Sequence, residues 1–246
     1  MIQLEVCANS IQSAIEAQKG GALRVELCDN LADGGTTPSL AQIETTRKSI
    51  DIQLYTIIRP RGGDFFYSAI EFEIMKRDAH LCGQAGCDGI VIGILNPDGT
   101  IDKKRNKELI DIARQYNMGV TFHRAFDRTA DLSGAMEDII ALGCERILTS
   151  GGKKTALEGK EVIKQLIEKA AGRISIMPGG GITENNIQEL VEYTGLKEFH
   201  GSFQSQFIGK MEYKTTLIGS EKEEYSYLQT DSNRVKLALQ RANNAK

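Results

Sequence analysis

Residues 4–28 read LEVCANSIQSAIEAQKGGALRVELC, and this stretch contains the unit from which the fold is predicted. It begins and ends with strand-like runs that finish in two related tripeptides, EVC at 5–7 and ELC at 26–28. The segment between them ends at two glycines, as expected where a chain leaves a helix through the left-handed region. The stretch therefore predicts a strand, a helix and a second strand.

The two tripeptides also predict a site. Because successive side chains of a strand point to opposite faces, Glu5 and Cys7 share one face, as do Glu26 and Cys28. Unpaired carboxylates are costly against a layer of packed helices, so this face is expected to turn inward, into the lumen of a barrel. Two carboxylates and two thiols should then meet on neighbouring strands about 4.8 Å apart.

The same unit recurs along the whole chain. Runs rich in Val, Ile and Leu lie at 3–7, 23–28, 52–59, 88–93, 118–123, 145–149, 174–178 and 197–201. Helical segments follow them, opened by capping signals such as Ser39 with Gln42 and Ser68 with Glu71. Eight strand–helix units in 246 residues match a (β/α)₈ TIM barrel in number and size. No G-x-G-x-x-G motif follows the first strand, which disfavours a doubly wound nucleotide-binding sheet. We expect an α/β protein with a single TIM-barrel domain over residues 1–246.

The C-terminal part departs from this pattern. Residues 203–231 carry aromatic and aliphatic side chains without clear periodicity, and a last helix is predicted at about 232–243. We expect an irregular insertion that covers the barrel rim or contacts a second subunit. Since symmetric dimers are the commonest soluble assemblies, a homodimer is the favoured interpretation.

Bulk composition limits the partners and the compartment. The net charge is −3 and basic residues are interspersed with acidic ones, which argues against nucleic-acid or anionic-membrane binding. No run approaches the ~20 apolar residues that a membrane span requires, and the N-terminus lacks the features of a signal peptide. Five irregularly spaced cysteines are too few for a secreted disulfide scaffold and are expected to be reduced. These features favour a cytoplasmic protein.

Polar residues cluster where the predicted strands end, the position of active sites in TIM barrels. An imidazole ordinarily titrates near neutral pH, as a general acid or base requires, and His123 shares its strand end with Arg124 and Asp127. His200 ends the eighth strand. Arg59 and Arg61 share a strand face and could close the barrel in an ion-pair network with the carboxylates, bind a substrate, or do both. The candidate catalytic residues are Glu5, Glu26, Arg59, Arg61, His123, Arg124, Asp127 and His200.

Glycine-rich loops after the sixth and seventh strands suggest an anion site. In many such barrels, backbone N–H groups of the late loops bind a phosphate, and glycine allows the close approach. The candidate residues are Ser150, Gly151, Gly179, Gly180, Gly181 and Ser202. The alternative is that these glycines only make sharp turns between strand and helix.

Cys7 and Cys28 could bind one soft metal ion, since thiolates select Cu(I) or zinc over hard cations. Zinc needs three or four ligands, of which His123 or His200 could supply one, whereas Cu(I) accepts fewer. The alternative is that both cysteines pack as small hydrophobic side chains. No organic cofactor is predicted.

Several motifs together resemble a known family. The strings LEVCANS, RVELCDNLADGGTTPS, IIRPRGGDFFYS, VTFHRAFD, RILTSGG, IMPGGGI and EFHGS, in this order over residues 4–202, are similar to the CutC family of copper homeostasis proteins. The resemblance implies a TIM barrel, a cytosolic setting, often a homodimer, and Cu(I) binding at Cys7 and Cys28. It does not imply an established reaction.

Two functions therefore remain open. The first is a cytosolic copper homeostasis protein that binds or traffics Cu(I) through Cys7 and Cys28. The second is a TIM-barrel enzyme that acts by acid/base chemistry on a small, phosphorylated metabolite. In the second case the charged residues of the mouth and the glycine loops would bind the substrate.

Overall fold

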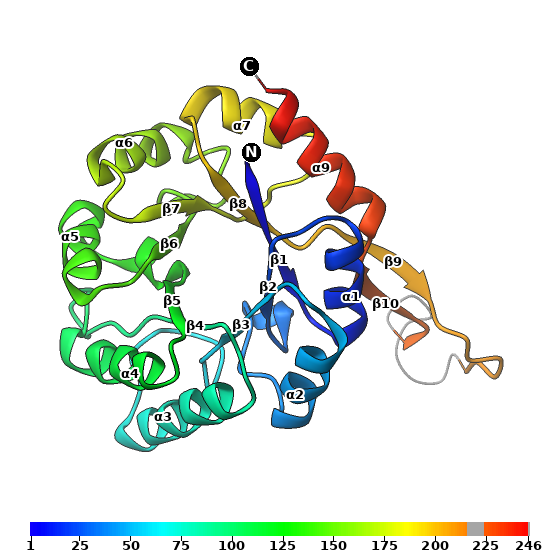
Figure 1. Cartoon of the computed structure of the whole chain (residues 1–246), viewed down its shortest axis with the longest axis horizontal. Helices are drawn as coiled ribbons and strands as arrows, with labels where there is room; N and C mark the ends of the chain where they lie inside the picture. The colour runs from blue at the N-terminus through cyan, green and yellow to red at the C-terminus, as the bar shows by residue number, and fades with distance from the viewer. Residues whose placement is uncertain (216–223, 246) are drawn as a thin grey trace.

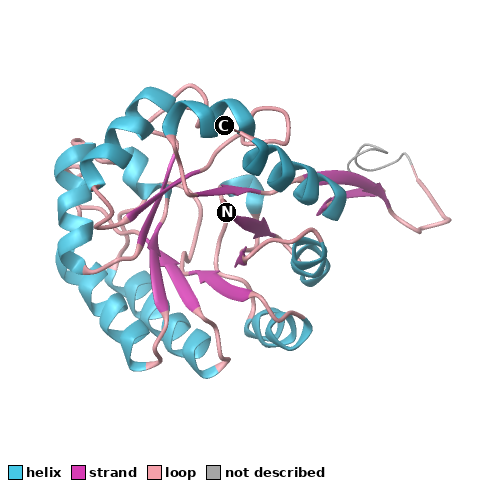
Figure 2. Cartoon of the chain, turned by 45° about the horizontal axis from the view of Figure 1, so that its top comes forward, coloured by secondary structure: helices cyan, strands magenta, loops and turns pink. Residues whose placement is uncertain are grey.

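The computed structural model describes residues 1–215 and 224–245. Within these ranges, eight parallel strands alternate with helices and wind nearly into a closed barrel, with the helices outside (Figure 1). Figure 2 shows the helical layer around the strands from a second direction. The predicted α/β TIM barrel is confirmed.

The barrel strands overlap the eight predicted runs. They are β1 (Gln3–Ala8), β2 (Arg24–Leu27), β3 (Gln53–Ile57), β4 (Gly89–Ile92), β5 (Gly119–Phe122), β6 (Arg146–Thr149), β7 (Ser175–Pro178) and β8 (Glu198–Gly201). Their order is β7-β6-β5-β4-β3-β2-β1-β8, so the last strand pairs with the first. This closure brings residues from the two ends of the chain side by side at the mouth.

The helices follow the capping signals of the sequence. They are α1 (Ile11–Lys19), α2 (Leu40–Ser49), α3 (Ala69–Gln84), α4 (Lys103–Gln115), α5 (Leu132–Leu142), α6 (Lys160–Ala170), α7 (Ile187–Thr194) and α9 (Ser232–Asn244), with short 3-10 helices η1 (Leu31–Asp33) and η2 (Arg124–Arg128). Ser39 caps α2, and Ser68 and Glu71 form the predicted capping box of α3. None of the described helices is long and apolar enough to cross a membrane.

Each strand divides its side chains between two environments. Leu4, Val6 and Ala8 of β1 pack under the helices, in the main hydrophobic core. Cys7 belongs to a separate cluster inside the barrel with Cys28, Tyr55, Ile57 and Val91. The inward direction predicted for the cysteines is therefore confirmed.

The segment before the last helix differs from the irregular structure expected for it. Its two ends pair as an antiparallel hairpin, β9 (Gln204–Ile208) with β10 (Ser226–Thr230), while residues 216–223 lie outside the described ranges. The hairpin projects from the side of the barrel beside α1 and α9 (Figure 1). It therefore does not cover the barrel mouth.

Candidate functional site at the barrel mouth

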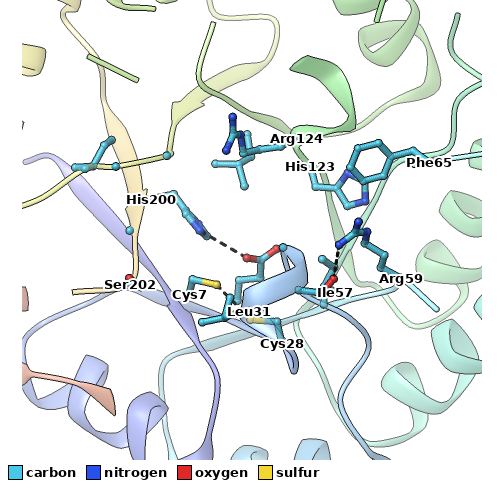
Figure 3. A pocket seen from close by; sticks show the side chains of 18 of the residues that line it. Cys7, Cys28, Leu31, Ile57, Arg59, Phe65, His123, Arg124, His200 and Ser202 are labelled. Atoms are coloured by element: carbon cyan, nitrogen blue, oxygen red, sulfur yellow. Dashed lines mark hydrogen bonds and ion pairs between the residues drawn. The ribbon is translucent and has the colours of Figure 1, made fainter. Parts of the chain in front are cut away.

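A cavity of about 360 Å³ opens at the carboxyl ends of the strands. Figure 3 shows its two sides, with Cys7, His200 and Ser202 on one and Arg59, Phe65 and His123 on the other. A cavity of this size is within the range of small-molecule sites and larger than one metal ion needs.

Two thiols form part of the cavity floor. The Sγ atoms of Cys7 and Cys28 lie 3.2 Å apart, and the Cys28 thiol also donates to the carbonyl of Ala8. All five cysteines of the chain are free and buried. The hydrogen bond with Cys28 and burial raise the pKa of Cys7 well above its usual value, so its sulfur is a thiol near neutral pH.

A carboxylate and an imidazole lie beside the thiols. One ligand atom each from Cys7, Glu26 and His200 falls within 4.8 Å of the others, and all three residues are buried. The Nε2 atom of His200 lies 3.6 Å from a carboxylate oxygen of Glu26. The position of Cys7 opposite Glu26 in the β1–β2 register accounts for part of this convergence.

A buried ion-pair network supports the floor from below. Arg24 forms ion pairs with Glu5 and Glu198, and Arg146 reaches Glu198 from the opposite side. Nδ1 of His200 contacts Glu5 at 2.8 Å and links the network to the cavity. The sequence analysis missed Arg24 and Glu198, although each lies two residues before a recognised inward-facing residue and therefore on the same strand face.

These contacts shift the pKa values in opposite directions. Burial raises the pKa of Glu5, but the charge of Arg24 and the hydrogen bond with His200 outweigh it and lower the pKa to about 2. Burial also raises the pKa of Glu26, and its net pKa stays above the ordinary value despite the charge of His200. Burial lowers the pKa of His200, but its contacts with Cys7 and Glu5 and the two carboxylate charges raise it well above the ordinary value. His200 is therefore a cation at neutral pH.

His123 is held in the neutral form. Burial and the positive charge of Arg59 lower its pKa to about 3. Nδ1 accepts a hydrogen bond from the N–H of Ala125 at 3.1 Å, so the imidazole proton resides on Nε2. That nitrogen is buried and has no hydrogen-bond partner among the described residues. A neutral imidazole with such a low pKa is a poor base near neutral pH but remains a hydrogen-bond donor.

The two arginines after β3 separate. Arg59 is buried, lines the cavity, and donates to the carbonyls of Asp33, Gly35 and Gly63. Arg61 turns away from the cavity and pairs with Glu71 and Asp64. The expectation that both arginines balance the lumenal carboxylates is wrong, because β3 ends at Ile57 and Arg24 has that role.

Asp127 closes the loop after β6. Its carboxylate accepts hydrogen bonds from the N–H groups of Ser150 and Gly152 and from the hydroxyl of Thr149. Gly151 donates its N–H to Thr149. These donors would be needed to bind a phosphate, so the geometry does not favour an anion site at Ser150 and Gly151.

The loops after β7 and β8 do reach the cavity. Gly180, Gly181 and Ser202 line it. Among the described residues, the N–H groups of the two glycines have no hydrogen-bond acceptor. Arg124 also lines the cavity, at its rim, where it donates to Asp127 and Ser150. This side can offer N–H donors to a ligand.

The structure thus gathers most of the predicted residues at one cavity. Its lining includes Cys7, Glu26, Cys28, Arg59, His123, Arg124, Gly180, Gly181, His200 and Ser202. It does not include Glu5, Arg61, Asp127, Ser150, Gly151 or Gly179. Glu5 and Asp127 instead hold other residues in place, through contacts that the sequence alone does not show.

Comparison with known proteins shows which sequence family and which solved structure the chain resembles. Residues 2–205 match the model of the CutC family. A family protein CutC of Chromobacterium violaceum is 46% identical over 236 residues, which cover 95% of each chain. The human copper homeostasis protein cutC homolog is 46% identical over 237 residues, 95% of this chain and 86% of that one. A crystal structure of CutC from Streptococcus agalactiae superimposes with a TM-score of 0.78 at 37% identity, covering 82% of this chain and 99% of that chain.

Proposed function

The chain belongs to the CutC family, and from this premise we propose that it is a copper homeostasis protein that binds Cu(I) at Cys7 and Cys28. The observation that carries the proposal is the 3.2 Å separation of the two sulfurs on the floor of an open cavity. Thiolates are the ligands that Cu(I) prefers over the carboxylates and carbonyls elsewhere in the mouth.

The donor set fits a soft ion after a small adjustment. An ion bound in a trigonal plane by two thiolates at about 2.3 Å needs its sulfurs about 4 Å apart. Cys7 and Cys28 would have to separate by about 1 Å, which a rotation of one side chain can provide. His200 is the available third ligand, since it shares the cluster with Cys7.

Binding of Cu(I) has to displace protons. Coordination by two thiolates releases the thiol protons of Cys7 and Cys28, and coordination by the imidazole would also release a ring proton of His200, because its pKa is raised. Affinity should therefore increase with pH. The release of an imidazolium proton would also weaken the contact with Glu5 and couple metal binding to the buried network.

The test is a Cu(I) titration of the reduced protein against a competing chelator. We expect one ion per chain, with binding lost in the Cys7→Ser/Cys28→Ser variant. The matched control is Cys82→Ala/Cys87→Ala, which removes the other pair of interacting thiols, at the end of α3 and outside the cavity. Equal affinity in the Cys7→Ser/Cys28→Ser variant and the wild type would refute the proposal.

A second function is favoured by a separate observation. Glu26 and His200 both have raised pKa values and lie 3.6 Å apart beside a cavity larger than one ion needs. We propose as the alternative that the pair performs acid/base chemistry on a small metabolite, with Arg124 and the loop at Gly180 and Gly181 binding its phosphate. Mass spectrometry of small molecules trapped by the purified protein tests this. The alternative fails if wild type and Glu26→Gln trap and convert the same compounds.

Two further features are part of the proposal. The five buried free thiols are consistent with a cytosolic location, which cell fractionation can test. The exposed apolar side chains of the β9–β10 hairpin, among them Ile208, Tyr227 and Leu228, are consistent with contact to a second copy in a homodimer.

A further inference from the structure

Arg59 carries a buried charge that no anion balances. Its side chain is buried in the wall of the cavity, and its Nη1 and Nη2 atoms donate only to backbone carbonyls. Across the described ranges, no carboxylate lies within ion-pair distance of the guanidinium. The arginines of the network below the cavity differ, since buried Arg24 and half-buried Arg146 both pair with Glu198. A buried cation without a counter-ion is unfavourable unless a ligand supplies the charge.

The free donors of Arg59 lie along one edge of its guanidinium. Nη1 uses both of its protons on Asp33 and Gly35, and Nη2 uses one on Gly63. Nε is buried with no partner among the described atoms. The Nε–H and one Nη2–H therefore have no carbonyl acceptor within the described structure, although the neutral Tyr67 hydroxyl contacts the guanidinium. A guanidinium can bind a carboxylate through an Nε–H and an Nη2–H in two parallel hydrogen bonds.

His123 adds a donor on the same side of the cavity (Figure 3). Its Nε2–H is buried and unpaired within the described structure, and its ring packs on Phe65, which also lies under the Arg59 guanidinium. Gly93 makes room for this ring, since a Cβ there would lie 2.5 Å from its Nδ1 and Cε1 atoms. The imidazole is thus fixed in place.

We propose that Arg59 and His123 form a binding site for the carboxylate group of a small-molecule ligand. The site is distinct from the dithiol across the cavity. The inference deepens the second function proposed above, because it identifies one end of the metabolite, and it requires no reaction. It also accounts for two buried donors that a metal carrier would leave unused.

Charge selects a carboxylate over a phosphate here. Arg59 contributes one positive charge and His123 is neutral, so a single negative charge on the ligand balances the charge on this side of the cavity. A phosphate dianion would leave an unbalanced negative charge in a cavity that Glu26 also lines. The hydroxyl of Tyr67, buried near Arg59, carries no charge and cannot replace the anion.

The test uses acetate, acetamide and inorganic phosphate as probes of the full-length reduced protein, without copper. Binding is measured by calorimetry, and the ring nitrogens of the histidines are followed by NMR. Acetate should bind and move the Nε2 signal of His123. Acetamide, which has the same shape without the charge, should bind at least about tenfold more weakly, the difference expected for a charge-assisted bidentate pair. Phosphate, even where it binds at Gly180 and Gly181, should leave the His123 signal in place.

Two variants locate the site. His123→Phe should weaken acetate binding by about tenfold, and His123→Gln, which retains an N–H donor, should recover part of the loss. His80→Phe is the matched control, because His80 contacts Tyr116 on the outside of the barrel. Arg59→Lys should retain the charge but lose the two-bond geometry and bind acetate more weakly. Melting curves check that each variant is folded.

The inference is wrong if acetate and acetamide bind equally, if phosphate moves the His123 signal as acetate does, or if acetate does not move that signal. It is also wrong if folded His123→Phe binds acetate like the wild type. Because the assay contains no copper and measures no turnover, these outcomes leave both proposed functions to their own tests.

Discussion

Nδ1 of His200 lies 2.8 Å from a carboxylate oxygen of Glu5, although the residues are 195 positions apart in the chain. Pairing of β8 with β1 places them opposite each other in the sheet register. Through this contact, the mouth of the barrel is connected to the buried Arg24–Glu5–Glu198 network. The charge state of the site therefore depends on groups that do not line the cavity.

Removal of Glu5 should be strongly destabilising. The Glu5→Gln substitution leaves Arg24 with one carboxylate instead of two, and His200 keeps only the longer contact with Glu26. We expect unfolding free energy to fall by about 3–5 kcal/mol, the usual cost of breaking a buried ion pair, as measured by urea denaturation. Glu137→Gln, which breaks an exposed pair with Arg173, should cost about 1 kcal/mol or less. Equal costs would contradict the network.

His123 and His200, the two histidines at the mouth, have pKa values shifted in opposite directions, so they should have opposite effects on the pH dependence of stability. Between about pH 6.5 and 3, His123 is protonated in the unfolded chain but stays neutral in the folded chain. This residue therefore makes the free energy of unfolding decrease as the pH falls. His200 has a raised folded pKa, so its contribution is complete below about pH 6.5 and is lost as the pH rises through that folded pKa. NMR titration should find His123 neutral and His200 protonated at the same mildly acidic pH.

The stability of His123 variants gives a second measurement of this effect. His123→Gln should flatten the acid-side dependence by up to about 1.4 kcal/mol per pH unit below pH 6.5. A His123→Gln profile that parallels the wild type would show that the imidazole is not held neutral.

Substitution of Gly93 should displace the His123 ring. In Gly93→Ala, the new methyl group would lie 2.5 Å from Nδ1 and Cε1 of His123, so the ring must move and its bond with Ala125 must weaken. We expect a stability loss of about 1–3 kcal/mol, typical of overpacking, and a shift of the His123 NMR signals. Unchanged signals would show that the backbone absorbs the methyl group.

Loss of the Asp127 carboxylate should convert its loop into an anion site. In Asp127→Ala, the N–H groups of Ser150 and Gly152 lose their acceptor, and Arg124 loses its ion pair. The variant should be less stable by about 2 kcal/mol or more, since several hydrogen bonds to a charged acceptor are broken. Inorganic phosphate or formate should restore part of this stability in thermal melts, with little effect on the wild type. No rescue would mean that the loop collapses without Asp127.

The hairpin gives a test of assembly. Tyr227 and Leu228 of β10 are exposed, and their replacement by serine leaves the barrel strands intact. If the hairpin contacts a second copy, light scattering on a sizing column should show a dimer for the wild type and a monomer for Tyr227→Ser/Leu228→Ser. A wild-type monomer at all concentrations would refute the homodimer.

The fold and the direction of the key side chains could be predicted from local sequence alone. Eight apolar runs separated by capped helices define the barrel, because strand and helix periodicity are properties of neighbouring residues. Alternation along β1 and β2 also placed Glu5, Cys7, Glu26 and Cys28 inside it. These predictions needed no knowledge of distant contacts.

The partners of those side chains were decided by the tertiary structure. Glu5 meets His200 and Arg24 only because β8 closes onto β1 and the strands are in a particular register. Asp127 reaches the loop after β6, and Arg61 turns outward to Glu71, because loop backbone geometry follows no period that a sequence displays. Sequence alone thus determined that Glu5, Cys7, Glu26 and Cys28 face the lumen. Closure of the barrel and its loops determined which of them are buried as structural ion pairs and which remain free to bind a ligand.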